Sequence, residues 1–257
     1  MSQPLQPDEI GRYARHLMLP EIGGAGQQRL KAARVLLVGA GGIGSPAALY
    51  LAAAGIGTLG LVDDDTVSLS NLQRQILFGT ADISAQKVAA GKRAIERLNP
   101  HVRVTAHALR LTDDTIDAVL GDYDFILDGS DNFDTRYLVA DRAAALEKPL
   151  VSAAVQRFSG QLTTLIPFAM NAAGLAEPGF RDLFPEAPPP GLVPSCAEVG
   201  ILGVVTGVMG TLAAAEIVKL ATGVGRPLVG RLLLYDALDA RFEEIGYRRR
   251  APHGPAD

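Results

Sequence analysis

A glycine-rich turn at residues 39–44 connects an apolar run at 34–38 to an alanine-rich segment at 45–54. Its glycines are Gly39, Gly41, Gly42 and Gly44. The apolar run predicts a buried strand and the alanine-rich segment a helix, so the turn leads into a helix N-terminus. Glycine lets the backbone approach phosphate oxygens, and the free N–H groups of the helix attract them. The turn therefore predicts nucleotide binding, but it is not a P-loop, because no Lys-Ser or Lys-Thr pair follows it.

Apolar runs alternate with helical patterns along the first half of the chain. The runs typical of strands lie at residues 34–38, 58–62, 102–106, 125–127 and 150–153. The segments at 45–54 and 87–98 are helical, and the second ends before Asn99 and Pro100. This order indicates βαβ units and a mostly parallel sheet.

The second half of the chain is less regular. Apolar runs at 161–166 and 231–235 lie on either side of a long helix predicted near 199–221. We interpret them as additions to the same sheet. The complete prediction is a Rossmann-like, doubly wound α/β fold with antiparallel additions in the C-terminal half.

Three parts are predicted along the chain. Residues 1–33 are expected to form an N-terminal helical arm, residues 34–247 a single nucleotide-binding domain, and residues 248–257 a flexible tail. Within the domain, a loop at 167–195 contains seven prolines. A loop of this length in a compact domain is usually functional or disordered.

Charge and cysteine content narrow the choice of partners. The formal net charge is −4 and the basic residues are scattered, which argues against nucleic acid as the main partner. The single cysteine, Cys196, excludes an intrachain disulfide and a cysteine-rich metal cluster, and fits a reducing compartment. Residues 1–8 lack the basic flank and apolar stretch of a secretory signal. We therefore expect a cytoplasmic protein.

An uncharged apolar run at 199–215 approaches the length of a membrane span, which is about 17 to 25 residues. Glu216 and Lys219 follow directly, and the run is rich in glycine and alanine. A buried core helix or a subunit-interface helix is the better interpretation, and no membrane association is expected.

Asp63 follows the predicted strand at 58–62, about 20 residues after the glycine-rich turn. In dinucleotide-binding folds a carboxylate at this position binds ribose hydroxyls. These features fit any adenine nucleotide, so an NAD-dependent oxidoreductase is an alternative at this stage.

The polar segment after Asp63 favours a triphosphate over a dinucleotide. Arg74 can make bidentate contacts with phosphate oxygens, and Asn71 and Gln75 can bond to phosphate or ribose. Lys87 lies one short connection further on. Each of these side chains alone is more often a solvated surface residue, but together, after a glycine-rich turn, they favour phosphate binding.

A second polar constellation follows the predicted strand at 125–127. Ligands of open parallel sheets lie beyond the carboxyl ends of the strands. Asp128 or Asp131 is therefore placed to hold Mg²⁺ beside the phosphates, and we favour Asp131. The alternative is that Asp128 and Asn132 cap the next helix, and the two uses are compatible.

These motifs together resemble the MoeB/ThiF family of E1-like adenylyltransferases, which activate ubiquitin-like sulfur carriers in molybdopterin or thiamine biosynthesis. The matching segments are residues 12–16, 39–45, 70–75, 131–137 and 194–200. The resemblance implies that the domain at 34–247 is an adenylation domain of a homodimer. Its substrates would be ATP, with Mg²⁺, and the C-terminal Gly-Gly carboxylate of a carrier protein.

The resemblance also assigns roles to individual residues. It gives nucleotide binding to Gly41, Asp63, Asn71, Arg74, Gln75 and Lys87, and metal placement to Asp131. The glycine-rich motif itself adds Gly39, Gly42 and Gly44 to the nucleotide-binding residues. Catalysis would rest on Arg74, Lys87 and Asp131, together with Arg15, which matches an arginine that reaches into the neighbouring subunit's ATP site. Cys196 matches a thiol that can join the carrier covalently, but a lone cysteine is as often a small buried residue, and both interpretations stay open.

Two departures from the family pattern concern the C-terminal lobe. Family members commonly hold zinc with two Cys-x-x-Cys pairs, but residues 179–185 and 253–257 contain no cysteine here. Four thiolates are impossible with one cysteine, so we expect no structural zinc, and packing and dimerisation must stabilise the lobe. We also expect no rhodanese domain within this sequence.

The implied reaction is attack of the carrier's carboxylate on the α-phosphate of ATP. This carboxylate is already ionised at neutral pH, so no general base is required. The product is an acyl-adenylate that a sulfur donor protein can attack, and the carrier's tail is expected to pass under the loop at 167–195.

Other functions fit these residues less well. An oxidoreductase lacks an identified proton-transfer residue, and a binding module without turnover leaves Arg15, Arg74 and Lys87 unexplained. A family relative that activates a tRNA base is a weaker alternative. The motifs do not distinguish a molybdopterin carrier from a thiamine carrier.

Overall fold

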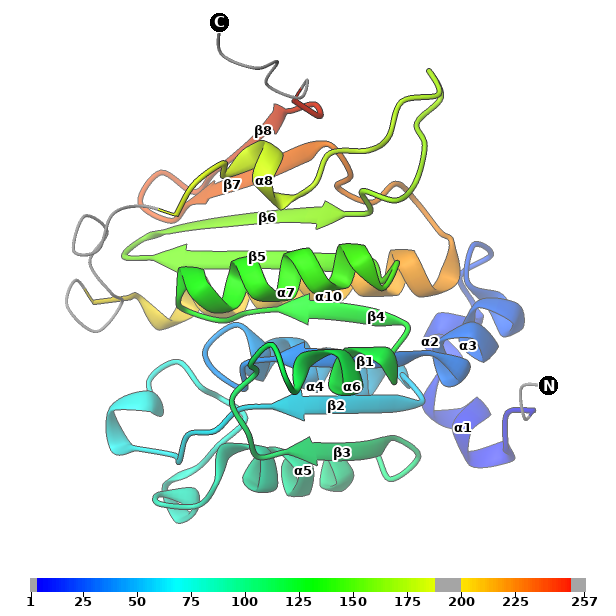
Figure 1. Cartoon of the computed structure of the whole chain (residues 1–257). Helices are drawn as coiled ribbons and strands as arrows, with labels where there is room; N and C mark the ends of the chain where they lie inside the picture. The colour runs from blue at the N-terminus through cyan, green and yellow to red at the C-terminus, as the bar shows by residue number, and fades with distance from the viewer. Residues whose placement is uncertain (1–3, 188–199, 251–257) are drawn as a thin grey trace, which may run out of the picture.

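An eight-stranded sheet forms the centre of the computed structural model, which describes residues 4–187 and 200–250 (Figure 1). The strand order is β3-β2-β1-β4-β5-β6-β7-β8. The first five strands in this order are parallel, and β6, β7 and β8 follow as antiparallel neighbours. The strands are β1 (Arg34–Val38), β2 (Thr58–Val62), β3 (Arg103–His107), β4 (Phe125–Asp128), β5 (Leu150–Gln156), β6 (Ser159–Leu165), β7 (Arg231–Asp236) and β8 (Arg241–Gly246). The predicted Rossmann-like fold with antiparallel additions is confirmed.

Helices cover both faces of this sheet (Figure 1). One face carries α3 (Gly23–Ala32), α4 (Gly44–Ala54), α5 (Lys87–Leu98) and α10 (Gly203–Thr222). The other carries α6 (Ile116–Gly121), α7 (Phe133–Ala145) and α8 (Phe180–Leu183). Shorter elements are α1 (Pro7–Arg12), α2 (Ala14–Leu17) and the 3₁₀ turns η1 (Leu69–Asn71) and η2 (Thr80–Asp82). Each helical layer packs on its own apolar cluster, which gives three layers, α/β/α.

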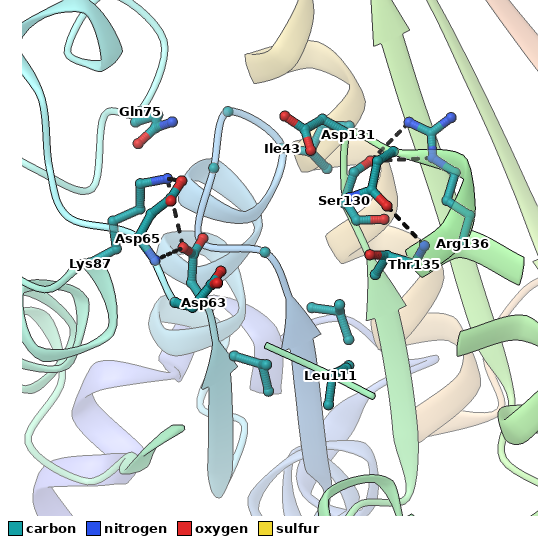
Figure 2. A pocket seen from close by; sticks show the side chains of 18 of the residues that line it. Ile43, Asp63, Asp65, Gln75, Lys87, Leu111, Ser130, Asp131, Thr135 and Arg136 are labelled. Atoms are coloured by element: carbon teal, nitrogen blue, oxygen red, sulfur yellow. Dashed lines mark hydrogen bonds and ion pairs between the residues drawn. The ribbon is translucent and has the colours of Figure 1, made fainter. Parts of the chain in front are cut away.

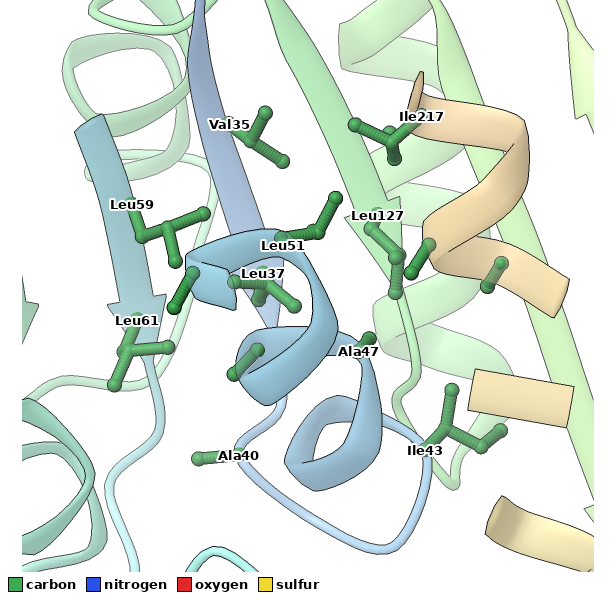
Figure 3. Close-up of a cluster of buried hydrophobic side chains, with 14 of the residues drawn as sticks. Val35, Leu37, Ala40, Ile43, Ala47, Leu51, Leu59, Leu61, Leu127 and Ile217 are labelled. Atoms are coloured by element: carbon green, nitrogen blue, oxygen red, sulfur yellow. The ribbon is translucent and has the colours of Figure 1, made fainter. Parts of the chain in front are cut away.

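Aliphatic side chains fill the space between the sheet and α4 (Figure 3). Leu37 of β1, Leu61 of β2 and Leu51 of α4 are fully buried. Burial of one such leucine stabilises the fold by about 2 to 3 kcal/mol. Because β1 and α4 flank the glycine-rich turn, their packing fixes the position of the turn.

The long helix α10 is apolar enough to cross a bilayer by length and composition alone. In the structure its side chains Val205, Met209 and Ile217 are fully buried in the cluster between the sheet and α4. Glu216 on the same helix is buried as well, and accepts hydrogen bonds from Thr164 Oγ1 (2.6 Å) and the Leu228 N–H (2.7 Å). These contacts are those of a core helix, as predicted for the apolar run.

Some element boundaries differ from the sequence prediction. The helix Lys87–Leu98 lies where it was predicted, but α10 begins at Gly203 rather than near residue 199. The short helix α8 interrupts the proline-rich loop and was not predicted. β8 was also missed, because all six of its side chains are exposed and the strand shows no apolar alternation. Residues 188–195 of the loop lie outside the described residues.

The N-terminal helices dock on the C-terminal end of α4. Asn99 Nδ2 donates to the Ala52 carbonyl (2.7 Å) and to the Tyr13 hydroxyl (2.8 Å). Gln27 Nε2 donates to the Ala54 carbonyl (2.8 Å). The last turn of a helix leaves such carbonyls without intrahelical partners. Since Tyr13, Gln27 and Asn99 are all buried, these bonds hold the N-terminal segment firmly against the domain.

Candidate active site

A cavity of about 310 Å³ opens beyond the carboxyl ends of β1, β2 and β4. Strand order reverses between β1 and β4, since β2 and β3 lie on one side of this pair and β5 on the other. Ligands of open α/β sheets bind at such a switch point. Figure 2 shows Lys87 on one side of the cavity and Asp131 and Arg136 on the other.

The glycine-rich turn forms the floor between these two sides. Gly39 has a φ of 90°, in the left-handed region that favours glycine. A Cβ at Gly39 would lie 3.3 Å from the carbonyl oxygen of Gly129, so the turn touches the loop after β4. A Cβ at Gly44 would overlap the Gly39 carbonyl oxygen. The turn therefore needs glycine at both ends to leave its N–H groups near a ligand.

Asp63 is held by backbone donors and by a lysine. Its carboxylate accepts from the N–H groups of Ala40 and Asp65, each at 2.9 Å. Lys87 Nζ lies 3.7 Å from Asp63 Oδ1 and 2.8 Å from Asp65 Oδ2. Burial raises the pKa of Asp63 above its ordinary value, although Lys87 and the two N–H groups oppose this shift. An acidic group with fixed orientation thus lies at the end of β2, as ribose binding requires.

Arg74 and Gln75 line the same side of the cavity. Arg74 Nη1 donates to the Ser70 carbonyl (3.1 Å), which anchors the side chain. Gln75 is buried, and its Oε1 has no hydrogen-bond partner among the described residues. Buried polar atoms without partners are rare in proteins, so this amide oxygen points to a polar ligand.

The loop after β4 is fixed through Ser130. Its N–H donates to Asp128 Oδ1 (2.9 Å), and its carbonyl accepts from Arg136 Nη2 (2.8 Å) and Nε (3.2 Å). Asp128 is buried, and burial raises its pKa, while Arg136 and Ser130 act in the opposite direction. Asp128 therefore positions the loop and does not face the cavity.

Asp131, next in the chain, is exposed and lines the cavity. No hydrogen bond or ion pair involves its carboxylate within residues 4–187 and 200–250. Asn132 Oδ1 accepts from the Thr135 N–H (2.9 Å) and caps α7, as predicted, whereas Asp128, the other predicted cap, accepts from the Ser130 N–H and does not cap this helix. Of the two aspartates considered for Mg²⁺, Asp131 is the one with free oxygens toward the cavity.

Most of the residues proposed from the sequence meet at this cavity. Those that line it are Gly39, Gly41, Gly42, Asp63, Arg74, Gln75, Lys87 and Asp131. Gly44 and Asn71 do not line it: Gly44 closes the turn, and the Asn71 side chain accepts from the Ser68 N–H (3.4 Å). Arg15 lies on α2 and does not line the cavity of its own chain. Cys196 falls outside the described residues.

Several lining residues had no role assigned to them from the sequence. Arg136 is one, and Thr206 of α10 and residues 109–111 after β3 are others. Thr206 reaches the glycine-rich turn, since a Cβ at Gly42 would lie 2.9 Å from its Cγ2. Only the fold brings α10 to this turn. The loop after β3 does carry a signal, because it follows a parallel strand whose carboxyl end lies at the same edge of the sheet.

Few clusters of side chains in the described part of the chain could bind a metal ion together. The one cluster there of three or more His, Cys, Asp or Glu side chains able to share an ion is Asp63, Asp64 and Asp65. No cysteine or histidine belongs to it. The C-terminal lobe is instead joined by direct bonds, such as that between Thr163 Oγ1 and the Tyr247 hydroxyl (2.7 Å).

Comparison with known proteins gives consistent matches. The ThiF family matches residues 13–256. The chain is 48% identical to the probable adenylyltransferase/sulfurtransferase MoeZ of Mycobacterium tuberculosis, over 95% of this chain and 62% of that protein. It is also 48% identical to the sulfur carrier protein adenylyltransferase of Thermus thermophilus, over 94% of this chain and 89% of that protein. The crystal structure of PaaA superposes with a TM-score of 0.81 at 25% identity, covering 97% of this chain and 77% of that one.

Proposed function

The chain belongs to the ThiF family, and we propose that it uses ATP to adenylate the C-terminal Gly-Gly carboxylate of a ubiquitin-like sulfur-carrier protein. The observation that carries the proposal is the joint lining of one cavity by Arg74, Lys87 and Asp131 beside the glycine-rich turn. A triphosphate needs cations, N–H donors and a metal-binding carboxylate together. The name of the Thermus thermophilus relative supports a sulfur carrier as the second substrate.

The reaction makes one bond and breaks one. A carboxylate oxygen of the carrier attacks the α-phosphorus, and the bond from that phosphorus to the pyrophosphate oxygen breaks. Lys87 and Arg74 offset the negative charge that the phosphates carry, and the turn supplies N–H donors. Asp63 holds the ribose. No residue is needed to remove a proton, because the attacking carboxylate is ionised.

Mg²⁺ fits the carboxylate of Asp131. This side chain lies at the cavity with both oxygens unpaired among the described residues, and hard divalent cations prefer such oxygens. When bound, the ion would neutralise charge on the phosphates.

A homodimer would explain the position of Arg15. Its helix α2 lies beyond the amino ends of the parallel strands, opposite the end that carries the cavity (Figure 1). On the face with α4 and α10, Tyr50 and Val204 are 58% and 68% exposed. A two-fold axis that lies along this face and perpendicular to the strands would reverse the strand direction in the partner and bring Arg15 toward the partner's cavity.

The proposed reaction is one step of a pathway. The acyl-adenylate would pass to a sulfur donor protein, in molybdopterin or thiamine biosynthesis. We place these steps in the cytoplasm. The chain spans 62% of the length of the MoeZ relative, whose name also includes a sulfurtransferase. Cys196 is the candidate for a covalent link with the carrier.

Carrier-dependent exchange of labelled pyrophosphate into ATP tests this function directly. Each Gly-Gly carrier encoded in the same genome is assayed with the purified chain and Mg²⁺. Exchange with one carrier, and none with that carrier lacking its last glycine, supports adenylylation of the terminal carboxylate. Absence of exchange with every Gly-Gly carrier contradicts the proposal.

A further inference from the structure

Arg136 lies where the nucleotide cavity meets a second pocket. This pocket lies on the sheet face that carries α7 and α8, and it is bordered by Ser152, Ala154, Gln161, Thr163, Leu232, Phe133, Phe180 and Phe184. Among the described residues, Arg136 is the one that borders both spaces. The second pocket is small, about 10 Å³, so it marks the rim of the nucleotide cavity on the side of β5 and β6, and the guanidinium of Arg136 lies at this rim.

Only one edge of this guanidinium is occupied. Nε and Nη2 both donate to the Ser130 carbonyl, at 3.2 and 2.8 Å, and so use the side edge of the fork. Within residues 4–187 and 200–250, Nη1 makes no hydrogen bond. The end edge, formed by Nη1 and the second N–H of Nη2, is therefore open. Two parallel N–H groups at this edge match the two oxygens of a carboxylate.

The other cations of the cavity have different surroundings. Lys87 is paired with Asp63 and Asp65, and Arg74 donates to the Ser70 carbonyl. Arg110, from the loop after β3, also lines the cavity and is exposed. Figure 2 shows Arg136 beside Asp131, on the side of the cavity opposite Lys87. A carboxylate that approaches a triphosphate is repelled by it, so a cation at its point of entry lowers the electrostatic barrier.

We propose that the open end edge of Arg136 binds the C-terminal carboxylate of the protein substrate before it attacks ATP. This inference rests on the proposed function, because it needs a carboxylate-terminated substrate. The bidentate pair orients the carboxylate between Arg136 and the α-phosphate, and the bonds made and broken are those of adenylylation. Arg136 is thus a substrate-binding residue, in addition to its contact with Ser130.

The test compares two forms of one carrier, one ending in Gly-Gly carboxylate and the other in Gly-Gly carboxamide. The carrier is the one active in pyrophosphate exchange, or otherwise a Gly-Gly carrier from the same genome. Binding to the full chain is measured by calorimetry with a non-hydrolysable ATP analogue and Mg²⁺. Wild type should bind the carboxylate about tenfold more tightly, as expected for a charge-assisted pair. In Arg136→Gln this preference should fall to within about twofold.

Two further variants keep the test decisive. Arg142→Gln removes a positive charge from the same helix at a distant ion pair with Asp117, and should keep the tenfold preference. Arg136→Lys retains the charge without the fork, and should keep only part of it. The ratio of the two affinities within one variant is insensitive to a general loss of binding caused by a shift of Ser130.

The outcomes separate the two proposals. If the preference survives in Arg136→Gln, the role of Arg136 is wrong while adenylylation stands. If wild type binds both forms equally, the carboxylate site does not exist. If no Gly-Gly carrier binds and none supports exchange, the proposed function and this inference both fail.

Discussion

The ammonium group of Lys87 lies 2.8 Å from an oxygen of Asp65, although Lys87 is buried and Asp65 is exposed. A buried lysine that serves a phosphate needs a counter-ion when the phosphate is absent. Asp65 can fill this role and then turn to solvent when the nucleotide arrives. Asp65 therefore competes with the phosphates of ATP for the ammonium group of Lys87.

This competition predicts opposite effects of two substitutions. Lys87→Ala should lower kcat/KM for ATP by about 10²-fold or more, because a charge that stabilises the transferring phosphates is lost. Asp65→Asn should leave activity intact and tighten ATP binding by a few fold, roughly the effect of one exposed ion pair. Steady-state exchange kinetics and calorimetry with ATP measure both. Weaker ATP binding by Asp65→Asn would show that Asp65 assists the nucleotide.

A second prediction concerns the metal carboxylate. Asp131→Ala should abolish carrier-dependent exchange while the circular dichroism spectrum stays close to wild type, since this side chain is exposed and outside the core. Asp134→Ala, which removes an exposed carboxylate three residues away, is the matched control and should retain activity. Full activity of Asp131→Ala would move the metal role to another group.

The position of the candidate site could be predicted from the sequence because most of the residues that line the cavity sit next to strong local signals. The glycine turn, Asp63 and Asp131 each follow a strand, and parallel strands bring their carboxyl ends to one edge. Arg136 belongs to the family-like segment at 131–137, but no role was assigned to it from the sequence. Its side chain bonds back to the carbonyl of Ser130, which lies in the loop before α7. An arginine in the first turns of a helix is ordinarily solvated, so this contact could not be predicted.

Packing between distant segments limited the prediction in other places. Lys87 is buried beside Asp63 and Asp65, which lie more than 20 residues earlier in the chain. The sequence alone does not show that these side chains meet. β8 pairs with β7 through its backbone while its side chains stay exposed, so hydropathy could not identify it. The role of Arg15 in a neighbouring subunit, which the family resemblance implies, stays a prediction.

The raised pKa of Asp63 predicts a pH effect on nucleotide binding. The ionised form accepts ribose hydroxyls with both oxygens, and protonation turns one oxygen into a donor and weakens the bonds that the group accepts. Because burial raises this pKa, the loss of affinity should begin at a higher pH than the ordinary aspartate pKa of about 3.9 would give. Affinity for AMP is measured from pH 7 downward in wild type and in Asp63→Asn. The difference between their curves, which cancels the titration of AMP itself, should shrink as the pH falls.

A constant difference between the two curves over the range in which the protein stays folded would contradict this prediction. Circular dichroism at each pH defines that range.

Tyr247 predicts a loss of stability at alkaline pH. Burial raises its pKa to about 12, although the bond with Thr163 acts in the opposite direction. The unfolded chain releases this proton near pH 10 and the folded chain retains it longer, so stability declines from about pH 10 to pH 12. The expected decline is about 2 kcal/mol in the free energy of unfolding. Urea unfolding at several pH values should show a steeper decline for wild type than for Tyr247→Phe, and equal slopes would contradict the assignment.

The last prediction concerns Arg15 and the dimer together. Within one chain, Arg15 lies at the end of the sheet opposite the cavity, and its guanidinium only approaches Met18 Sδ (3.8 Å). The docking of Tyr13 on Asn99 prevents a large movement of this segment. Arg15 can therefore serve a nucleotide only in a second copy. Arg15→Ala should then be nearly inactive in exchange although the change is remote from the chain's own cavity.

Mixed dimers distinguish this shared site from a long-range structural effect. Arg15→Ala and Asp131→Ala homodimers should both be nearly inactive, because every site in them lacks one group. In a dimer with one chain of each kind, one site combines both defects and the other has neither, as two-fold symmetry requires. Activity within the mixed species should then return to about half of wild type. Subunits carrying different affinity tags allow the mixed species to be isolated and counted. If verified mixed dimers stay inactive, Arg15 does not complete the partner's site, and its effect must arise within its own chain.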